Sequence, residues 1–291
     1  MSINDDYNAL IDDWKANVAN HIISSDDTDR LAEYALHMSR ILAYPDLDIA
    51  GTLKRIDQMA DDLKYSIKKL MPLRPTQMIE QINNYLFKDK GFRANVQDYH
   101  NPLNSYLNIV LEQRLGIPIT LSILYIRIAY FVKFKLYPVN FPAHFLVKHV
   151  LEGDNSEIII DPFNGGRIMD DYSLKELLDQ FYPRQNVPLT RAFVEKATPA
   201  QVMTRMLNNL KGSYYEAQDI DKAQIANEMI IAIDKYNPDA IRDKGMILLK
   251  RGKAIEALEM LNLYLELDPE AADADAVLDI IRQVRTESNK I

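Results

Sequence analysis

The chain contains no cysteine. This absence excludes disulfide bonds, thiolate zinc sites and cysteine nucleophiles. Basic residues are fewer than acidic ones: the chain has 34 lysines and arginines and 42 aspartates and glutamates, which gives a formal net charge of −8. A chain of this charge is not attracted to phosphate backbones or anionic lipid, so we expect neither nucleic acid nor a membrane as its main partner.

Long hydrophobic runs are also lacking. The longest, residues 117–132, is interrupted by Thr120, Ser122 and Arg127 and falls short of the roughly 20 apolar residues that span a bilayer. The N-terminal segment is acidic and has neither the basic region nor the apolar core of a signal peptide. These features predict a cytoplasmic protein. With 291 residues, 47% of them hydrophobic, the chain can form one large domain with an appendage, or two domains.

Helical periodicity dominates the first ninety residues. Apolar side chains recur at intervals of three and four over residues 28–42, and the pattern continues over residues 53–67. The sequence therefore predicts an N-terminal helical segment, residues 1–90, that packs on the core of the protein.

Two helices are predicted to meet at a short turn in the middle of the chain. Asn101 can cap the first helix, Gly116 is expected to end it in the left-handed conformation, and Pro118 suits the first position of the second. The second helix runs to about Phe134 and is apolar on most faces. A helix of this kind is normally central to a domain.

The period changes to two after this helix. Residues 141–151 and 157–160 have the composition and alternation of strands, and the NGG sequence at residues 164–166 is a turn signal. Residues 91–190 are therefore predicted to form a core of helices with a small antiparallel sheet.

The last hundred residues are helical and weakly self-similar. Gly212 and Gly245 recur at an interval in the low thirties, as do two prolines further along the chain. That period, with its helix-turn-helix content, is typical of tetratricopeptide repeats. Residues 198–291 are therefore predicted to be such repeats, with a plain helical bundle as the alternative, and residues 182–199 are the expected linker.

Three features of the middle region resemble parts of a catalytic site. The turn at residues 116–122 leads into a buried helix, His144 lies in the strand that follows, and Asp161 ends the next strand. A nucleophile at a helix start, a histidine base and an orienting aspartate form the papain-like arrangement. The order along the chain fits, but the nucleophile is missing.

The motifs that carry this site also point to a family. The sequences NPLNSYLNIVLEQRLGIPITLSILYIRIA, NFPAHFLVKH and IDPFNGG occur in this order, ahead of the helical repeats. In this combination the chain resembles the bacterial SirB-type family, in which a transglutaminase-like domain precedes tetratricopeptide repeats and no activity is established. The resemblance implies a mostly helical α+β fold: a papain-like, transglutaminase-like core with a small antiparallel sheet, then a C-terminal α-helical repeat.

The same resemblance assigns roles to individual residues. Active transglutaminase-like enzymes place a cysteine at the start of the central helix and a histidine and an aspartate on the next two strands. His144 and Asp161 match the last two, and the cysteine position falls at or near Pro118. A hydroxyl can replace the thiol only with a well-placed base and an oxyanion site. Thr120, or Ser122, with His144 and Asp161 is the candidate remnant triad; alternatively both hydroxyls bond to their own helix.

His144 and Asp161 also have a structural interpretation, in which a buried, hydrogen-bonded pair stabilises the junction of two strands. The sequence has no phosphate-binding loop and no histidine pair with metal-ligand spacing, so we expect no cofactor and no metal. The leading hypothesis is a non-catalytic module that binds a protein or peptide and serves regulation. The alternatives are a hydroxyl-nucleophile hydrolase or acyl transferase, and a regulator that binds a metabolite in the vacated cleft.

Overall fold

The computed structural model describes residues 3–25, 27–153 and 156–288. The chain forms two compact units, one of residues 24–206 and one that joins residues 1–23 to residues 207–291. Both are mostly helical and the larger holds a small antiparallel sheet, so the predicted fold class is confirmed. The predicted boundaries near residues 90 and 190 stay predictions. Within the described residues, no helix has the length and apolar character needed to cross a membrane.

The larger unit opens with a series of helices. They are η2 (Thr28–Arg30), α3 (Leu31–Leu42), α4 (Ile49–Ile67), η3 (Lys68–Leu70), α5 (Pro75–Asn83) and the π-helical η4 (Asn84–Asp89). The helical periodicity of residues 28–42 and 53–67 is confirmed by α3 and α4. Asp48 begins α4 by accepting a hydrogen bond from the Gly51 N–H at 2.9 Å, as an N-cap aspartate should.

The predicted pair of helices is present as α6 (Leu107–Gln113) and α7 (Pro118–Phe131), with β2 (Leu115–Gly116) between them. Strand β2 pairs in parallel with β1 (Arg93–Ala94). Asn101 caps not α6 but a separate 3-10 helix, η5 (Pro102–Ser105), that precedes it.

The prediction that Gly116 ends the first helix in the left-handed conformation is wrong. Arg114 takes that conformation, with a φ of 59°, and ends α6. Gly116 lies in β2, where an added Cβ would come within 2.9 Å of Thr120 Oγ1 and 3.0 Å of Leu121 Cγ. This position requires glycine because a side chain would not fit, and not because of its backbone conformation.

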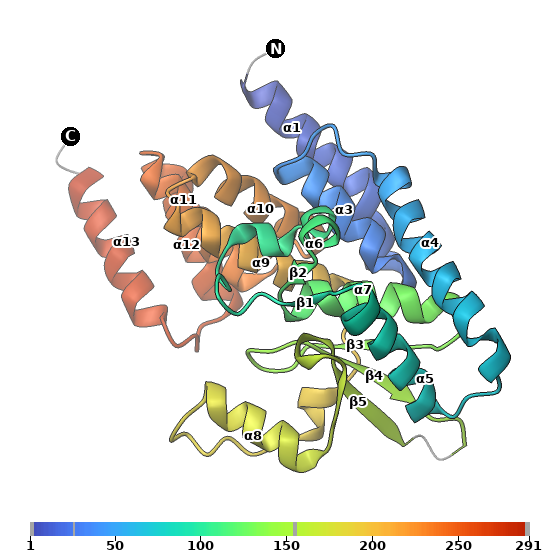
Figure 1. The fold of residues 1–291 in the computed structure, drawn as a ribbon. Helices are drawn as coiled ribbons and strands as arrows, with labels where there is room; N and C mark the ends of the chain where they lie inside the picture. Colours follow the sequence, from blue (N-terminus) through green and yellow to red (C-terminus); the bar gives the residue numbers. More distant parts are fainter. Residues whose placement is uncertain (1–2, 26, 154–155, 289–291) are drawn as a thin grey trace. The chain divides into compact units, whose positions relative to one another are not determined.

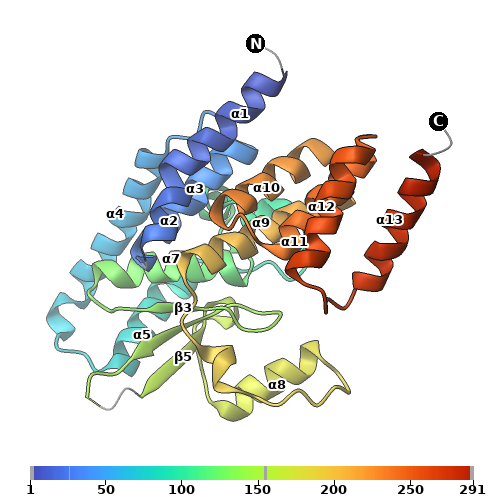
Figure 2. The ribbon, with the colours of Figure 1, turned by 180° about the vertical axis from the view of Figure 1, so that it is seen from behind.

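Helix α7 is the centre of the larger unit, as its composition predicts. It contacts α3, α4, α5 and α6 as well as strands β3 (Tyr137–Val139) and β4 (Leu146–Val150). It runs between α3 and α4 on one side and the sheet on the other (Figures 1 and 2). Its partly exposed cation, Arg127, pairs with both carboxylate oxygens of Asp57 on α4, at 2.9 and 3.0 Å. A helix that is apolar all round has to be enclosed in this way.

The sheet is antiparallel, in the order β3-β4-β5-β6. Its other strands are β5 (Glu157–Asp161) and β6 (Arg167–Met169), and α8 (Asp171–Phe181) follows them. One cluster of buried side chains joins strands to α8 and includes Leu146, Ile159, Leu174 and Leu178. The strand predicted over residues 141–151 begins only at Leu146, because a turn occupies its first residues.

The segment expected to act as a linker, residues 182–199, is bound to this sheet. It holds the 3-10 helix η7 (Arg191–Val194) and a bridge between Val139 and Lys196. The Ala197 N–H donates to the Pro138 carbonyl at 2.8 Å, and buried Lys148 Nζ donates to the Val194 carbonyl at 2.8 Å. These bonds make the segment part of the larger unit.

The smaller unit is helical throughout. It contains α1 (Ile3–Trp14), the π-helical η1 (Lys15–Ala19), most of α2 (Asn20–Ser24), the C-terminal part of α9 (Pro199–Glu216), α10 (Ile220–Ile233), α11 (Pro238–Lys250), α12 (Ala254–Leu267) and α13 (Ala274–Ser288). Helices α11 and α12 approach so closely that a Cβ on Gly245 would lie 2.7 Å from Leu261 Cγ. Such close pairs of antiparallel-type helices fit the predicted repeat.

Candidate functional site

A buried histidine–aspartate pair lies where β4 begins and β5 ends. His144 Nε2 is 3.0 Å from Asp161 Oδ1, and the two side chains are 3% and 0% exposed. The structure therefore brings together these two predicted site residues. Because a carboxylate oxygen accepts this bond, Nε2 donates it, and Nδ1 is the ring nitrogen left for another group.

Asp161 has a second role as a cap. Its Oδ1 accepts hydrogen bonds from the N–H groups of Phe163 at 3.0 Å and Asn164 at 3.3 Å, and its Oδ2 accepts one from Asn164 Nδ2 at 2.7 Å. It thereby begins the 3-10 helix η6 (Pro162–Asn164). With the bond from His144, four donors surround one fully buried carboxylate, which is how a protein compensates for burying such a group.

His144 is presented by a tight turn, and its predicted place in a strand is wrong. The His144 N–H donates to the Phe141 carbonyl at 3.1 Å, which closes a four-residue turn. Pro142 is its second residue and Ala143, with a φ of 54°, its third. Proline followed by a positive φ defines a type II turn, whose third position normally holds glycine. The turn therefore stores strain next to the histidine.

Substitution of Ala143 tests this strain. We expect Ala143→Gly to raise the free energy of unfolding by about 0.5 to 1 kcal/mol, because relief of the left-handed penalty exceeds the entropy cost of glycine. Ala143→Val should lower it by at least about 1 kcal/mol, since a β-branched residue tolerates positive φ poorly. Urea titrations of both variants measure the difference. A less stable glycine variant would contradict a strained turn.

The two candidate hydroxyls lie inside α7. Thr120 Oγ1 accepts a hydrogen bond from the Ile117 N–H at 3.1 Å and donates to the Asn104 carbonyl at 3.0 Å. Its bond to the N-cap backbone is half of a capping box, so Thr120 stabilises the helix start. Ser122 Oγ is buried with no hydrogen-bond partner among the described residues. Both side chains are 0% exposed, and within the described chain neither bonds to His144.

Aromatic side chains that the sequence did not single out surround the histidine. The His144 ring lies 5.8 Å from the Phe163 centroid and 6.2 Å from that of Phe181, and Tyr99 meets Phe163 edge to face at 6.0 Å. Tyr99 and Phe181 are 38% and 43% exposed. We call Tyr99, Phe163 and Phe181 the aromatic patch. They come from three separate segments, so no local periodicity could have identified them.

A cation from α9 completes the site. Arg205 Nη1 donates to the Phe141 carbonyl at 2.9 Å, the same carbonyl that accepts the His144 N–H. Burial lowers the pKa of the Arg205 guanidinium, and nearby Tyr99 acts in the opposite direction. In the part of the chain that the structure describes, no carboxylate pairs with Arg205. Sequence patterns do not identify Arg205 as a site residue, because it falls within the segment predicted to form the repeats.

The described residues provide a base and an orienting carboxylate, but the two candidate nucleophiles, Thr120 and Ser122, are both buried. A neutral imidazole can accept a proton, yet acyl transfer through a covalent intermediate also needs an activated thiol or hydroxyl within reach. The aromatic patch and Arg205, in contrast, offer apolar area and a positive charge, which are the common elements of recognition sites.

Comparisons with known proteins agree with the two-part organisation. The transglutaminase-like superfamily matches residues 51–208, and the tetratricopeptide repeat matches residues 210–282. The UPF0162 protein of Xylella fastidiosa (strain Temecula1) is 34% identical over 255 residues, which cover 87% of this chain and 89% of that protein.

Two further relatives are more distant. The UPF0162 protein YchA of Escherichia coli (strain K12) is 27% identical over 243 residues, 82% of this chain and 84% of its own. F-box only protein 21 of Homo sapiens is 30% identical over 220 residues, 72% of this chain but 32% of its own length. No solved structure matches the chain.

Proposed function

This chain belongs to the transglutaminase-like superfamily and carries a tetratricopeptide repeat, and from that premise we propose that it is a non-catalytic module that binds a protein or peptide. The observation that carries the proposal is a site without its nucleophile. His144 and Asp161 are bonded at 3.0 Å, while the chain has no cysteine to act with them. The repeat adds support, because stacked helical pairs usually serve as binding surfaces.

The surroundings of His144 favour recognition over turnover. Aromatic side chains provide large contact area at low cost in conformational entropy. A partly buried guanidinium without a carboxylate partner is suited to bind an acidic side chain or a C-terminal carboxylate. The peptides expected to bind therefore combine an apolar side chain, for the aromatic patch, with a carboxylate for Arg205.

Selection from a random peptide library on the full chain tests this proposal. We expect selected peptides to carry both groups, and Arg205→Gln to raise their Kd at least tenfold, since a hydrogen bond between charged groups contributes about 1.5 to 3 kcal/mol. Fluorescence anisotropy measures the affinity. Arg55→Gln, an exposed arginine on α4 with the same change of charge, is the matched control. Equal losses in both variants, or no selectable peptide, would speak against the proposal.

A hydroxyl-nucleophile hydrolase or acyl transferase that uses Thr120 or Ser122 is the alternative. Complete burial of both hydroxyls, and the capping role of Thr120, weigh against it. Ester and amide probes should show no hydrolysis above the buffer rate. Turnover by the wild type that is lost in a folded His144→Ala variant would replace the binding function with this one.

The SirB-type regulatory role and a cytoplasmic location are parts of the same proposal. The first is supported by the order of the three motifs ahead of the repeat, and the second by the acidic composition. Neither changes the expected outcome of the binding test.

A further inference from the structure

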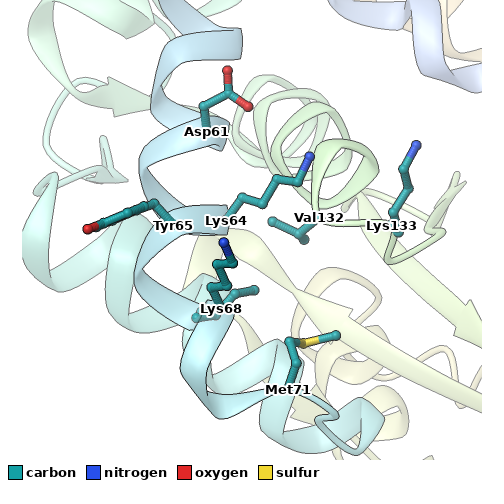
Figure 3. Close-up of a pocket in the computed structure, with 8 residues that line it drawn as sticks. Asp61, Lys64, Tyr65, Lys68, Met71, Val132 and Lys133 are labelled. Atoms are coloured by element: carbon teal, nitrogen blue, oxygen red, sulfur yellow. The ribbon is translucent and has the colours of Figure 1, made fainter.

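A hollow opens in the larger unit where the C-terminal ends of α4 and α7 approach each other (Figure 3). Its volume is about 460 Å³, within the range of small-molecule sites. It is lined by Asp61, Lys64, Tyr65, Ile67, Lys68, Met71, Val132 and Lys133, and we call it the lysine hollow. None of these residues belongs to the His144 site.

Three lysines and a single carboxylate, that of Asp61, line this hollow. Lys64 and Lys68 lie one helical turn apart, at the end of α4 and the start of η3, and Lys133 follows the C-cap residue of α7. Like charges at this spacing repel each other. Among the described residues, none of the three lysines forms an ion pair with a carboxylate.

The helix ends reduce this excess of positive charge without cancelling it. Each helix C-terminus is equivalent to about half a negative charge, so each lysine also has a structural role there. Two such ends and Asp61 together offset about two of the three ammonium charges. Roughly one positive charge remains, in a protein of net charge −8. The hollow therefore suits a monoanion such as a carboxylate better than a doubly charged phosphate.

The interior of the hollow is apolar. Ile67 and Val132 are buried behind it, and Met71 borders it with half of its surface exposed. Lys64 extends from α4 toward Val132, and Lys68 of η3 and then Met71 lie below it in the view (Figure 3). The methylene stems of the two lysines add apolar wall while the ammonium groups stay at the rim. If the lysines only neutralised the helix C-termini, this apolar surface would have no role.

From charge and lining together, we propose that the lysine hollow binds an aliphatic carboxylate. The hydrocarbon chain lies against Ile67, Met71 and Val132, and the carboxylate is held by the ammonium groups of Lys64 and Lys68. Lys133 closes the rim from the other helix. This site is separate from the proposed peptide-binding function, so either can fail without the other.

Isothermal titration of the full chain with decanoate, below its micellar concentration, tests the proposal. We expect saturable binding of one molecule, and binding at least tenfold weaker for decanol, which lacks the charge, and for acetate, which lacks the chain. The double variant Lys64→Gln/Lys68→Gln should raise the Kd for decanoate about tenfold, through two partly exposed ion pairs. Lys54→Gln/Lys88→Gln removes two exposed lysines elsewhere and should leave the Kd within about twofold.

Two outcomes would overturn the proposal. One is equal weakening in the two double variants, which would indicate attraction by overall charge. The other is co-sedimentation with phosphatidylglycerol vesicles without binding of monomeric decanoate, which would assign this face to a lipid surface. Methionine methyl NMR locates the ligand independently, because decanoate should shift the Met71 resonance and leave those of buried methionines such as Met203 unchanged.

Discussion

Replacing Asp161 with alanine should lower the free energy of unfolding of the larger unit by about 3 to 5 kcal/mol. The substitution removes the common acceptor of His144 Nε2, the Phe163 and Asn164 N–H groups and Asn164 Nδ2. Each donor left unsatisfied in the interior costs about 1 to 3 kcal/mol, and relaxation of the short η6 helix recovers part of the sum. Far-ultraviolet circular dichroism during urea unfolding measures the loss.

The choice of probe matters in this experiment. The single tryptophan, Trp14, belongs to the smaller unit, so its fluorescence would follow the wrong part of the chain. Circular dichroism detects the helices of both units, and two separate transitions would have to be fitted separately.

Two further variants serve as comparisons for Asp161→Ala, one at the same position and one at an exposed aspartate. Asp161→Asn keeps the shape and one acceptor oxygen, so we expect a loss of about 1 to 3 kcal/mol. Asp89→Ala removes an exposed aspartate at the end of η4 and should change stability by no more than about 0.5 kcal/mol. If Asp161→Ala cost no more than Asp89→Ala, the pair would have no structural role, and its persistence in a chain without a thiol would need a chemical explanation.

The expected cost also bears on how the histidine–aspartate pair should be interpreted. A carboxylate that caps η6 and holds the His144 ring remains necessary after the nucleophile is gone. Its presence is therefore not by itself a sign of catalysis. A test of activity has to use a His144 variant, because replacing Asp161 also lowers stability, and the loss of activity could then not be separated from unfolding.

Periodicity in the sequence predicted the elements, but not how the turns between them are built. The central helix, the antiparallel strands and the C-terminal helical pairs follow from patterns of apolar side chains, and the structure confirms them. His144 was placed in a strand because residues 141–151 alternate. The turn at Pro142 and Ala143 was not foreseen, since alanine gives no local sign that it will adopt a positive φ.

The candidate site, too, could be predicted from the sequence only in part. His144 and Asp161 were identified by motif order, and their bond joins residues 17 positions apart. Asn104, in η5, accepts the Thr120 hydroxyl of α7 on its carbonyl. Contacts of this kind, like those of Arg205, depend on tertiary packing and leave no pattern in the sequence.

Replacing Trp14 with alanine should destabilise the smaller unit by about 3 to 5 kcal/mol. The indole is 0% exposed, and its Nε1 donates to the Met229 carbonyl of α10 at 3.0 Å. A second bond, from Gln224 Nε2 to the Tyr7 hydroxyl at 3.1 Å, also joins α1 to α10. Truncation to alanine leaves a cavity of indole size and removes a buried hydrogen bond, and the cavity accounts for most of the cost.

Trp14→Phe keeps most of the ring and should cost about 1 to 2 kcal/mol, mainly through the lost hydrogen bond. Tyr236→Ala, which removes an exposed aromatic side chain from the same unit, should change stability by no more than about 0.5 kcal/mol. Hydrogen exchange of the α10 amides measures the local effect without tryptophan fluorescence. Unchanged protection of the α10 amides in Trp14→Ala would mean that packing of α1 does not stabilise α10.

The expected result gives α1 a structural role as a cap of the helical repeat. A helical repeat needs a capping element, because the outermost helices cannot bury their apolar face against a neighbour. Here the chain supplies one from its other end: α1 and η1 lie against α10, more than two hundred positions away in sequence. A chain shortened to begin at Ser24 should therefore lose the protection of α10 as completely as Trp14→Ala does, even though residues 210–282 contain the whole recognisable repeat.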